Sequence, residues 1–422
     1  MATTESPAGD KKFLDFPTSC AAPLPQPEDP VRVVPLAVAG LLAAGLTAYV
    51  WASQGAKFGV LLLLGLGLGL ALFHSRFGFT SAWRQLVAVG NGQGVRAHAL
   101  LLGTAATLIA LIAGTGSGLF GSKPAPTAGA LGLSLFVGAT IFAIGMQLGG
   151  ACASGTLFAV GSGQSTIVLT LGGFIGGSVI YTWAYPVLNG WPEFKGILLA
   201  DHVGWFGSWA ITIAVLLAIV LGTRAVQRRR TPPPADVVPT AHGIARIFRG
   251  SWPMLVGALV LGVLAAAVFL VSGGIWGITS AFALWGAKIL QVFGLHPETW
   301  DFWRVKANAT QLTGSIWHDK NSLTDIGIMI GAAVAAAAAG AWKIHSSIPW
   351  RTALAAVLGG VLMGIGARMA NGCNIGAYLG GISTGSVHGW LWGVFALGGT
   401  WLGLKLRPLF GLANPIPTDS VC

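Results

Sequence analysis

The chain has 422 residues, of which 54% are hydrophobic and only 9% are charged, against about 25% charged residues in an average soluble protein. This composition excludes an ordinary soluble globule and predicts a polytopic membrane protein. The formal net charge of +11 fits the Lys and Arg excess of cytoplasmic membrane-protein loops, so no nucleic-acid partner is predicted.

Residues 1–32 are polar and Pro-rich and are predicted to form a disordered cytoplasmic tail, not a cleaved signal peptide, because no apolar segment follows a basic start. Apolar runs then predict about ten transmembrane helices, near residues 33–53, 57–74, 95–119, 128–148, 165–188, 207–224, 253–272, 324–344, 351–369 and 387–405.

The basic, Pro-rich stretch 224–250 is predicted to be a cytoplasmic linker. It separates a first membrane repeat, residues 33–223, from a second, residues 251–407, and residues 408–422 form a C-terminal tail. With the linker inside, both termini are predicted to be cytoplasmic as well. Lys288, Arg304, Lys306 and Lys320 then lie on the outer side.

The two halves resemble each other. The Gly-rich stretch around Cys152 shares glycines and serines at matching positions with the stretch around Cys373, and FGFTSAW, which ends at Trp83, matches WGITSAF, which ends at Phe282. Spans one to five and spans six to ten follow the same order, so that the sixth span, 207–224, lies before the linker and matches the first. Five spans per repeat is an odd number, which turns the second copy upside down. The predicted fold is therefore an all-α polytopic membrane protein with two inverted five-span repeats and short re-entrant half-helices.

The stretches GGACASG and NGCNIG predict turns between a span and a half-helix, because glycine permits positive φ and irregular backbone inside a bilayer must line protein or water. The free N–H groups at such a helix start form an anion site without a lysine. The candidate substrate-binding residues of the two motifs are Cys152, Cys373, Gly149, Gly150, Ser154, Gly155, Asn371, Gly372, Asn374 and Gly376.

Paired thiols are compatible with four kinds of chemistry. Two cysteines fall short of a metal site, and no CxxC motif supports a redox pair, so neither a metal nor a cofactor is predicted. Close packing of small residues and recognition of a soft, sulfur-bearing anion both fit the pattern, since a thiol is a weak S–H donor and a polarizable partner. Cys20 and Cys422, in the polar tails, are expected to be incidental.

Further candidates lie near these motifs. Arg368 could attract an anion or extend to the membrane interface, and His388 is expected at an interface or a helix contact. The expected spans hold almost no acidic residue except near Asp325, which argues against proton coupling through a carboxylate. Four hydroxyl residues could line the path or pack between helices: Thr80, Ser81, Thr279 and Ser280.

GGACASGT and LGGVLMGIGARMANGCNIGAYLGG resemble the paired motifs of the YeeE/YedE sulfur-transport family, over roughly residues 57–405. The resemblance implies a transporter, not an enzyme, in the bacterial cytoplasmic (inner) membrane. It also implies that Cys152 and Cys373 relay a thiosulfate-like ion inward. Relatives often have cysteine where this chain has Gly78. No sulfur-carrier domain with a CPxP motif follows the last span, so a cytosolic carrier would be a separate protein.

Three other functions stay open on the sequence. The chain could transport another sulfur or selenium species, act as a membrane thiol oxidoreductase, or serve as a structural membrane subunit. The oligomeric state is not indicated.

Overall fold

The computed structural model describes residues 30–126, 128–230, 243–344 and 347–415. Cys20 and Cys422 lie outside these residues, as do most of the predicted N-terminal tail and parts of the predicted linker and C-terminal tail.

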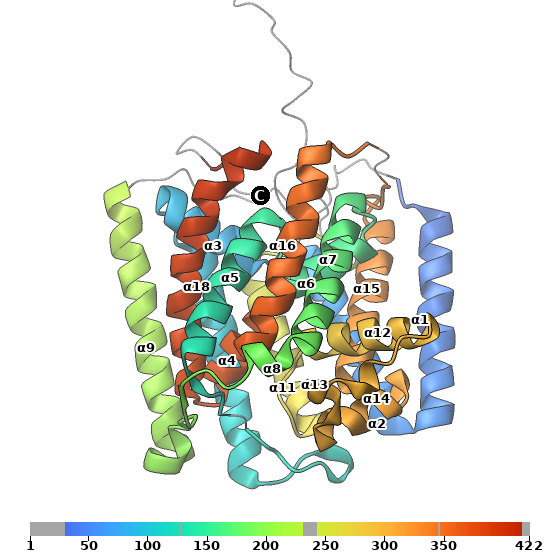
Figure 1. Cartoon of the computed structure of the whole chain (residues 1–422). Coiled ribbons are helices and arrows are strands. Elements are labelled where there is room, and N and C mark those ends of the chain that lie inside the picture. Colours follow the sequence, from blue (N-terminus) through green and yellow to red (C-terminus); the bar gives the residue numbers. More distant parts are fainter. Residues whose placement is uncertain (1–29, 127, 231–242, 345–346, 416–422) are drawn as a thin grey trace, which may run out of the picture.

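Long helices dominate the structure, and each predicted span coincides with one of them (Figure 1). They are α1 (Val33–Gln54), α2 (Ala56–Ser75), α4 (Gln93–Thr115), α5 (Leu133–Leu148), α7 (Ser165–Trp183), α9 (Ala200–Arg230), α11 (Met254–Ser272), α15 (Lys320–Ala338), α16 (Trp350–Met369) and α18 (Val387–Leu406). Within the described residues, nine helical stretches are long and apolar enough to cross a membrane. The helix α18, of 20 residues, is not among them, because His388, Lys405 and several Trp and Gly residues make it less apolar. The chain is an all-α polytopic membrane protein, as predicted.

Four short helical segments follow long helices after sharp turns, and the glycine motifs predict two of them, those that begin at Cys152 and Cys373. They are α3 (Phe79–Val89), α6 (Ala153–Gly161), α12 (Thr279–Val292), and η5 (Asn374–Leu379) continued by α17 (Gly380–Ser383). The TSA segments begin α3 and α12, and the two cysteine motifs begin α6 and η5. These are the half-helices of the predicted fold.

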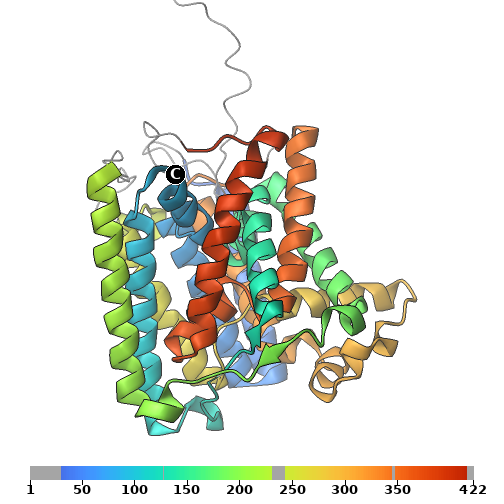
Figure 2. The same ribbon diagram turned by 60° about the vertical axis from the view of Figure 1, so that its left-hand side comes forward.

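The connections contain short elements. These are η2 (Leu119–Gly121), β1 (Leu131–Gly132), α8 (Tyr185–Leu188), β2 (Glu193–Phe194), α10 (Ala245–Arg249), η3 (Pro297–Thr299), α13 (Asp301–Arg304), α14 (Lys306–Thr313), η4 (Ile316–His318) and η6 (Arg407–Phe410). β1 pairs with β2 in antiparallel register, with Leu131 opposite Phe194. Figure 2 shows α13 and α14 in a lobe at the lower right, away from α9.

The two halves pack against each other with matching contacts. α7 packs on α16 as α18 packs on α5, and α2 packs on α15 as α11 packs on α4. The counterparts in the two halves are α2 and α11, α4 and α15, α5 and α16, and α7 and α18. Each contact between two helices is therefore repeated between their counterparts. Counterparts run in opposite directions: α5 and α16, α7 and α18, and α1 and α9 are antiparallel in Figures 1 and 2. Inverted repeats have this arrangement.

Glycines bring α5 and α16 into close contact at the centre. A Cβ added at Gly145 would lie 2.5 Å from the carbonyl oxygen of Gly359, and one added at Gly366 would lie 2.6 Å from the carbonyl oxygen of Gly138. Gly145 corresponds to Gly366 in the repeat, and Gly138 corresponds to Gly359. The two contacts are therefore the same contact made once by each half. Small residues at such crossings let membrane helices approach backbone to backbone.

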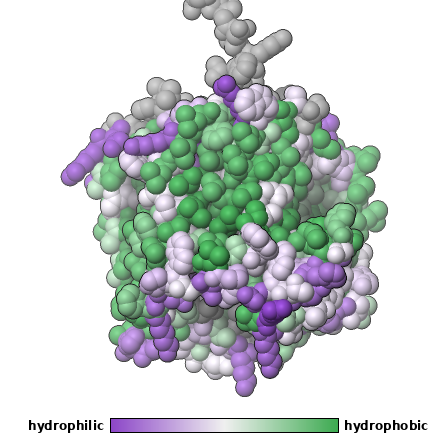
Figure 3. Space-filling model, viewed as in Figure 1, coloured by the Kyte–Doolittle hydropathy of each residue, from purple (hydrophilic) through white to green (hydrophobic). Residues whose placement is uncertain are grey.

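The outer surface fits a bilayer. Figure 3 shows a broad apolar face with hydrophilic residues toward its upper and lower margins. α1 and α9 lie at opposite flanks and leave large apolar side chains exposed, such as Leu41 and Leu221 (Figure 1). The start of α1, the end of α9 and η6 lie on the upper side, whereas β1, β2, α13 and α14 lie on the lower side.

Candidate functional site

Cys152 is the N-cap residue of α6. Its Sγ accepts a hydrogen bond from the backbone N–H of Gly155 at 3.4 Å, and its carbonyl oxygen accepts the first helical bond, from Thr156 N–H, at 2.7 Å. The thiol also contacts the hydroxyl of Ser154 at 3.5 Å. Gly150 has φ of 83°, a conformation that side-chain-bearing residues rarely adopt, so this glycine permits the turn from α5 into α6.

Cys373 caps η5 in the same way. Its Sγ accepts a hydrogen bond from Ile375 N–H at 3.4 Å, and its carbonyl oxygen accepts one from Ala377 N–H at 2.8 Å. The preceding turn has Asn371 at φ of 54° and Gly372 at φ of 140°. Each predicted motif thus places its thiol at the start of a half-helix, where backbone N–H groups converge.

The structure brings the two motifs together. Cys152 and Cys373 are 1% and 0% exposed and belong to one buried cluster. Both are free thiols. Their half-helices, α6 and η5, contact each other. Beside Cys373, Asn374 is fully buried, and neither its amide oxygen nor its amide nitrogen has a hydrogen-bond partner among the described residues.

The other motif glycines differ in their surroundings. Gly149 ends α5 and its carbonyl oxygen accepts a hydrogen bond from Thr170, at 3.0 Å. A Cβ at Gly155 would meet Cys152 Sγ at 3.3 Å, whereas a Cβ at the equivalent Gly376 would meet nothing within 4 Å. The backbone is therefore covered at the first motif and open at the second.

Each TSA segment is joined to the span that precedes the cysteine motif of its own half. In the first half, the Gln147 amide nitrogen donates to the carbonyl oxygen of Thr80 at 3.4 Å. In the second, Arg368 Nη2 donates to Thr279 Oγ1 at 3.0 Å. Gln147 and Arg368 are equivalent positions in the repeat. In both halves, therefore, the same position of the span before the cysteine motif binds the threonine of the TSA segment.

The remaining hydroxyl candidates are mostly engaged within the fold. Ser81 donates to the carbonyl oxygen of Gly78 at 3.3 Å, and Ser280 accepts a hydrogen bond from the amide of Asn321. Thr80 is buried, and its Oγ1 has no partner within the described part of the chain. None of these four residues is among those that line the cavity described next.

A cavity of about 320 Å³ opens beside the second motif. Arg368, Asn371 and Gly376 line it, all three of them residues that the sequence singles out. Arg368 Nε has no partner among the residues that the structure describes. The cavity thus presents an amide, a guanidinium group and open backbone close to Cys373 along the chain. It lies on the side of the molecule that carries β1 and β2.

The corresponding region of the first half is filled. Arg84 Nε donates to the side-chain oxygen of Gln147 at 3.0 Å, and Arg407 Nη1 donates to its carbonyl oxygen at 2.7 Å. Arg407 also binds the carbonyl oxygen of Ala413 at 2.6 Å and the side chain of Asn414 at 3.0 Å. The two halves are therefore asymmetric, with a cavity near Cys373 and a hydrogen-bonded cover near Cys152.

Several lining residues have no signal in the sequence. The cavity wall also contains Ser134, Tyr181, Asn189 and Glu193, which come from span ends and the β2 strand far from either motif. His388 lines it as well and contacts the carbonyl oxygen of Ala370 through Nε2, at 3.0 Å, which agrees with its expected helix-contact role. Across the described ranges, no group of three His, Cys, Asp or Glu side chains could hold a metal ion.

Comparison with known proteins points to one family. The profile of the family described as "Sulphur transport" matches residues 74–402. The chain is 26% identical to the thiosulfate transporter TsuA of Spirochaeta thermophila over 366 residues, which cover 81% of this chain and 96% of the relative. It is 29% identical to the thiosulfate transporter TsuA of Escherichia coli over 363 residues, covering 81% and 92%.

A second similarity is shorter. The probable transporter YedE of Escherichia coli is 30% identical over 161 residues, which are 38% of this chain. The match spans only 39% of the length of that relative.

Proposed function

This chain belongs to the Sulphur transport family, whose profile matches most of its membrane region. We propose that it takes up thiosulfate or a related sulfur-containing anion. The observation that carries the proposal is the meeting of two capped half-helices, each presenting one buried thiol, next to a cavity lined by Arg368. The similarity to two thiosulfate transporters over most of their length supports the choice of substrate.

The proposed path begins at the cavity. Arg368 and Asn371 supply donors to the oxygens of an anion, and the open backbone at Gly376 leaves room for it. The anion then meets Cys373 and Cys152 in turn. A thiol is a weak donor and a soft partner, which suits the terminal sulfur of thiosulfate. The N–H groups at the two half-helix starts add partial positive charge without a tightly binding lysine.

We further propose that the cavity faces outward and that the cover of Arg84, Gln147 and Arg407 faces the cytoplasm. The basic end of α9 lies on the same side as this cover, in agreement with the positive-inside rule. We propose the same domain division that the sequence predicts: a cytoplasmic N-terminal tail, repeats at 33–223 and 251–407, and a cytoplasmic linker at 224–250. We also propose that the protein lies in the bacterial inner membrane and that a separate cytosolic protein accepts the sulfur.

Replacing the thiols tests the function. We expect Cys152→Ala and Cys373→Ala each to reduce uptake of ³⁵S-thiosulfate into proteoliposomes about tenfold or more, since a hydrogen bond to a charged group contributes about 1.5–3 kcal/mol. Cys20→Ala, in the tail, is the matched control and should transport at the wild-type rate. Full uptake by both motif variants would contradict the proposed role of the thiols. Competition with selenate, sulfate and sulfite would identify another substrate species.

One observation favours a second candidate, a membrane thiol oxidoreductase: two buried free thiols begin half-helices that contact each other. This function predicts a Cys152–Cys373 disulfide that forms and breaks with the redox state. Mass spectrometry of alkylated protein under oxidising and reducing conditions separates the two functions. Thiols that stay free under both conditions would exclude the oxidoreductase and leave the transporter.

A further inference from the structure

Asp325 is a carboxyl group buried at the centre of the molecule. It lies on α15, is 0% exposed, and neither of its carboxyl oxygens has a hydrogen-bond partner among the described residues. The two ion pairs among the described residues, His296–Glu298 and Arg304–Asp301, are exposed and do not involve Asp325. An unpaired carboxylate in a membrane interior is costly, and such residues often mark ion or proton pathways.

The helix places Asp325 toward the candidate path. One turn before it, Asn321 donates to Ser280 at the start of α12, and one turn after it, the backbone of Met329 packs against Gly161 at the end of α6. Residues four apart share one face of a helix, so Asp325 faces the same elements. α15 also packs on α6, the half-helix that begins directly after Cys152, and on α12, whose Thr279 accepts a hydrogen bond from Arg368 in the cavity wall.

Within the described residues, no cation forms an ion pair with Asp325. The nearest acidic residue along the chain is Asp319, the N-cap residue of α15. α6 carries no titratable residue, and the Cys152 thiol precedes its first turn. Of the elements packed on α15, the remaining titratable or charged residues are Tyr49 on α1, Lys57 and His74 on α2, Lys288 on α12, Arg246 and Arg249 on α10, His318 on η4, and Lys320 on α15 itself. Lys288 and Lys320 each donate to a backbone carbonyl oxygen, of Leu312 and Ile275 respectively.

We propose that Asp325 is a proton-binding site that couples inward anion transport to an inward proton flux. An anion beside Cys373 repels a carboxylate, so the anion and a proton on Asp325 favour each other's binding, and this linkage is reciprocal. The proton comes from the outer solution, converts the carboxylate to a neutral carboxyl, and leaves to the cytoplasm after the anion. No covalent bond of the substrate changes. The inference rests on the proposed function and adds its energy source, contrary to the expectation from the scarcity of acidic residues.

The test uses the full-length protein in liposomes, with the membrane potential held at zero by valinomycin and equal potassium concentrations. With the outside one pH unit more acidic, coupling to one proton predicts about tenfold accumulation of ³⁵S-thiosulfate inside. Asp325→Asn, which mimics the neutral carboxyl, should still equilibrate thiosulfate but accumulate none. Asp325→Glu should restore accumulation. Asp301→Asn, an exposed carboxyl in α13, is the matched control and should accumulate about tenfold.

A second measurement does not depend on the folding of a variant. Pyranine inside wild-type vesicles should report acidification when thiosulfate is added outside. Thiosulfate uptake by the wild type without acidification or accumulation would overturn the inference and leave the proposed function in place. Accumulation by Asp325→Asn equal to that of the wild type would overturn the role of this residue. A wild type that moves no thiosulfate under any gradient would contradict the proposed function itself, and the inference with it.

Discussion

At the scale of single residues, the candidate site contains buried polar side chains that have no hydrogen-bond partner among the described residues. Most hydroxyl groups near the motifs bond within their own helix or to a neighbour, as Ser81 and Thr156 do. Asn374 and Asp325, in contrast, are fully buried without partners among the described residues. Buried polar groups are normally satisfied, so unpartnered ones indicate a place where a ligand or proton binds.

The position of Arg368 in the fold distinguishes between the two roles that the sequence allows for it. These are attraction of an anion and extension to the membrane interface. The structure holds its guanidinium against Thr279 at 3.0 Å and in the wall of the cavity. A cation fixed there interacts with an anion more strongly than one in bulk water, because the surroundings are less polar.

We therefore predict that Arg368→Gln raises the KM for thiosulfate uptake about tenfold, through loss of one charge-assisted hydrogen bond. Arg368→Lys, which keeps the charge but not the planar group, should give an intermediate value. Arg351→Gln, at the exposed start of the same helix, is the control and should leave KM unchanged. An unchanged KM in Arg368→Gln would show that this arginine has a structural role only.

At the scale of elements, capping and close packing hold the half-helices in position. The thiols of Cys152 and Cys373 replace the usual Ser, Thr, Asp or Asn side chains as acceptors for the first N–H groups. The spans in front of them, α5 and α16, cross at glycines. Because each half-helix follows directly from one of these spans, the crossing of α5 and α16 determines where both thiols lie.

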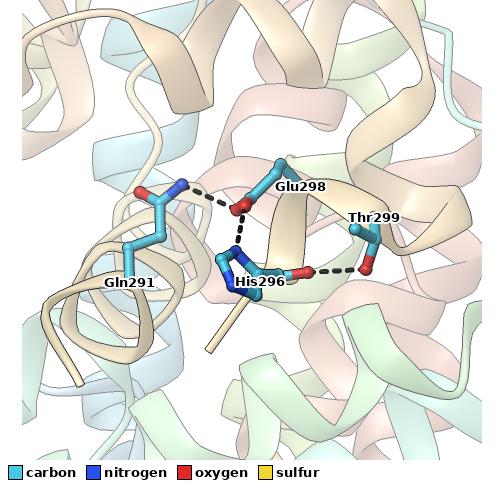
Figure 4. A network of polar contacts seen from close by, with 4 residues as sticks. All are labelled: Gln291, His296, Glu298 and Thr299. Carbon is cyan, nitrogen blue, oxygen red and sulfur yellow. Dashed lines mark hydrogen bonds and ion pairs between the residues drawn. The ribbon is translucent and has the colours of Figure 1, made fainter. Parts of the chain in front are cut away.

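The connection between α12 and η3 has its own polar network, outside the membrane-spanning helices (Figure 4). Gln291 Nε2 donates to Glu298 Oε2 at 2.9 Å, and His296 Nδ1 lies 2.8 Å from Glu298 Oε1. Thr299 donates to the carbonyl oxygen of His296 at 2.6 Å. The hydrogen bond from Gln291, followed by those from the Glu298 backbone and His296, lowers the pKa of the Glu298 carboxyl.

The sign of the pH effect follows from this lowered pKa. The network stabilises the folded connection above the ordinary pKa of glutamate, and the stabilisation is lost as the pH falls through the lowered pKa of Glu298. Gln291→Ala should raise the Glu298 pKa toward its ordinary value, as measured by carboxyl ¹³C NMR titration in nanodiscs. Arg304→Ala, in the adjacent exposed ion pair with Asp301, is the control and should leave the Glu298 pKa unchanged. A Glu298 pKa that does not move in Gln291→Ala would contradict the assigned cause.

At the scale of the whole molecule, the inverted repeats make two similar half-sites, and the asymmetry between them would give the proposed path a direction. The second half opens into the cavity beside Gly376, whereas in the first half Arg407 holds the end of α5 and the segment at Ala413 together. Alternation between two such arrangements is the usual mode of transport by inverted repeats. Release of the Arg407 contacts is then the step that would open the cytoplasmic side.

The proposed orientation leads to a labelling prediction. In a Cys20→Ser, Cys422→Ser background, a membrane-impermeant maleimide added to intact cells should label Lys306→Cys on α14, on the side with the cavity. It should not label Lys343→Cys, which follows α15 on the opposite side. Permeabilised cells should label both variants, which controls for accessibility. Labelling of Lys343→Cys alone in intact cells would reverse the proposed orientation.

The sequence by itself determined the membrane class, the positions of the long helices and the sites of the half-helices. Long apolar runs can be satisfied in only a few ways, and glycines beside a cysteine mark a turn wherever they occur. The repeat was readable as well, because FGFTSAW and WGITSAF keep the same order relative to the two cysteine motifs.

Only the tertiary structure decided which side chains meet. Tyr181, Glu193 and Arg368 line one cavity although they come from both halves, since the packing of α7 on α16 brings distant span ends together. The sequence pattern does not distinguish Asp325, which has no partner in the described part of the chain, from Asp319, which caps α15 through Ser322. Composition and periodicity record how apolar each segment is, whereas the partners of a buried polar group depend on the neighbours that folding supplies.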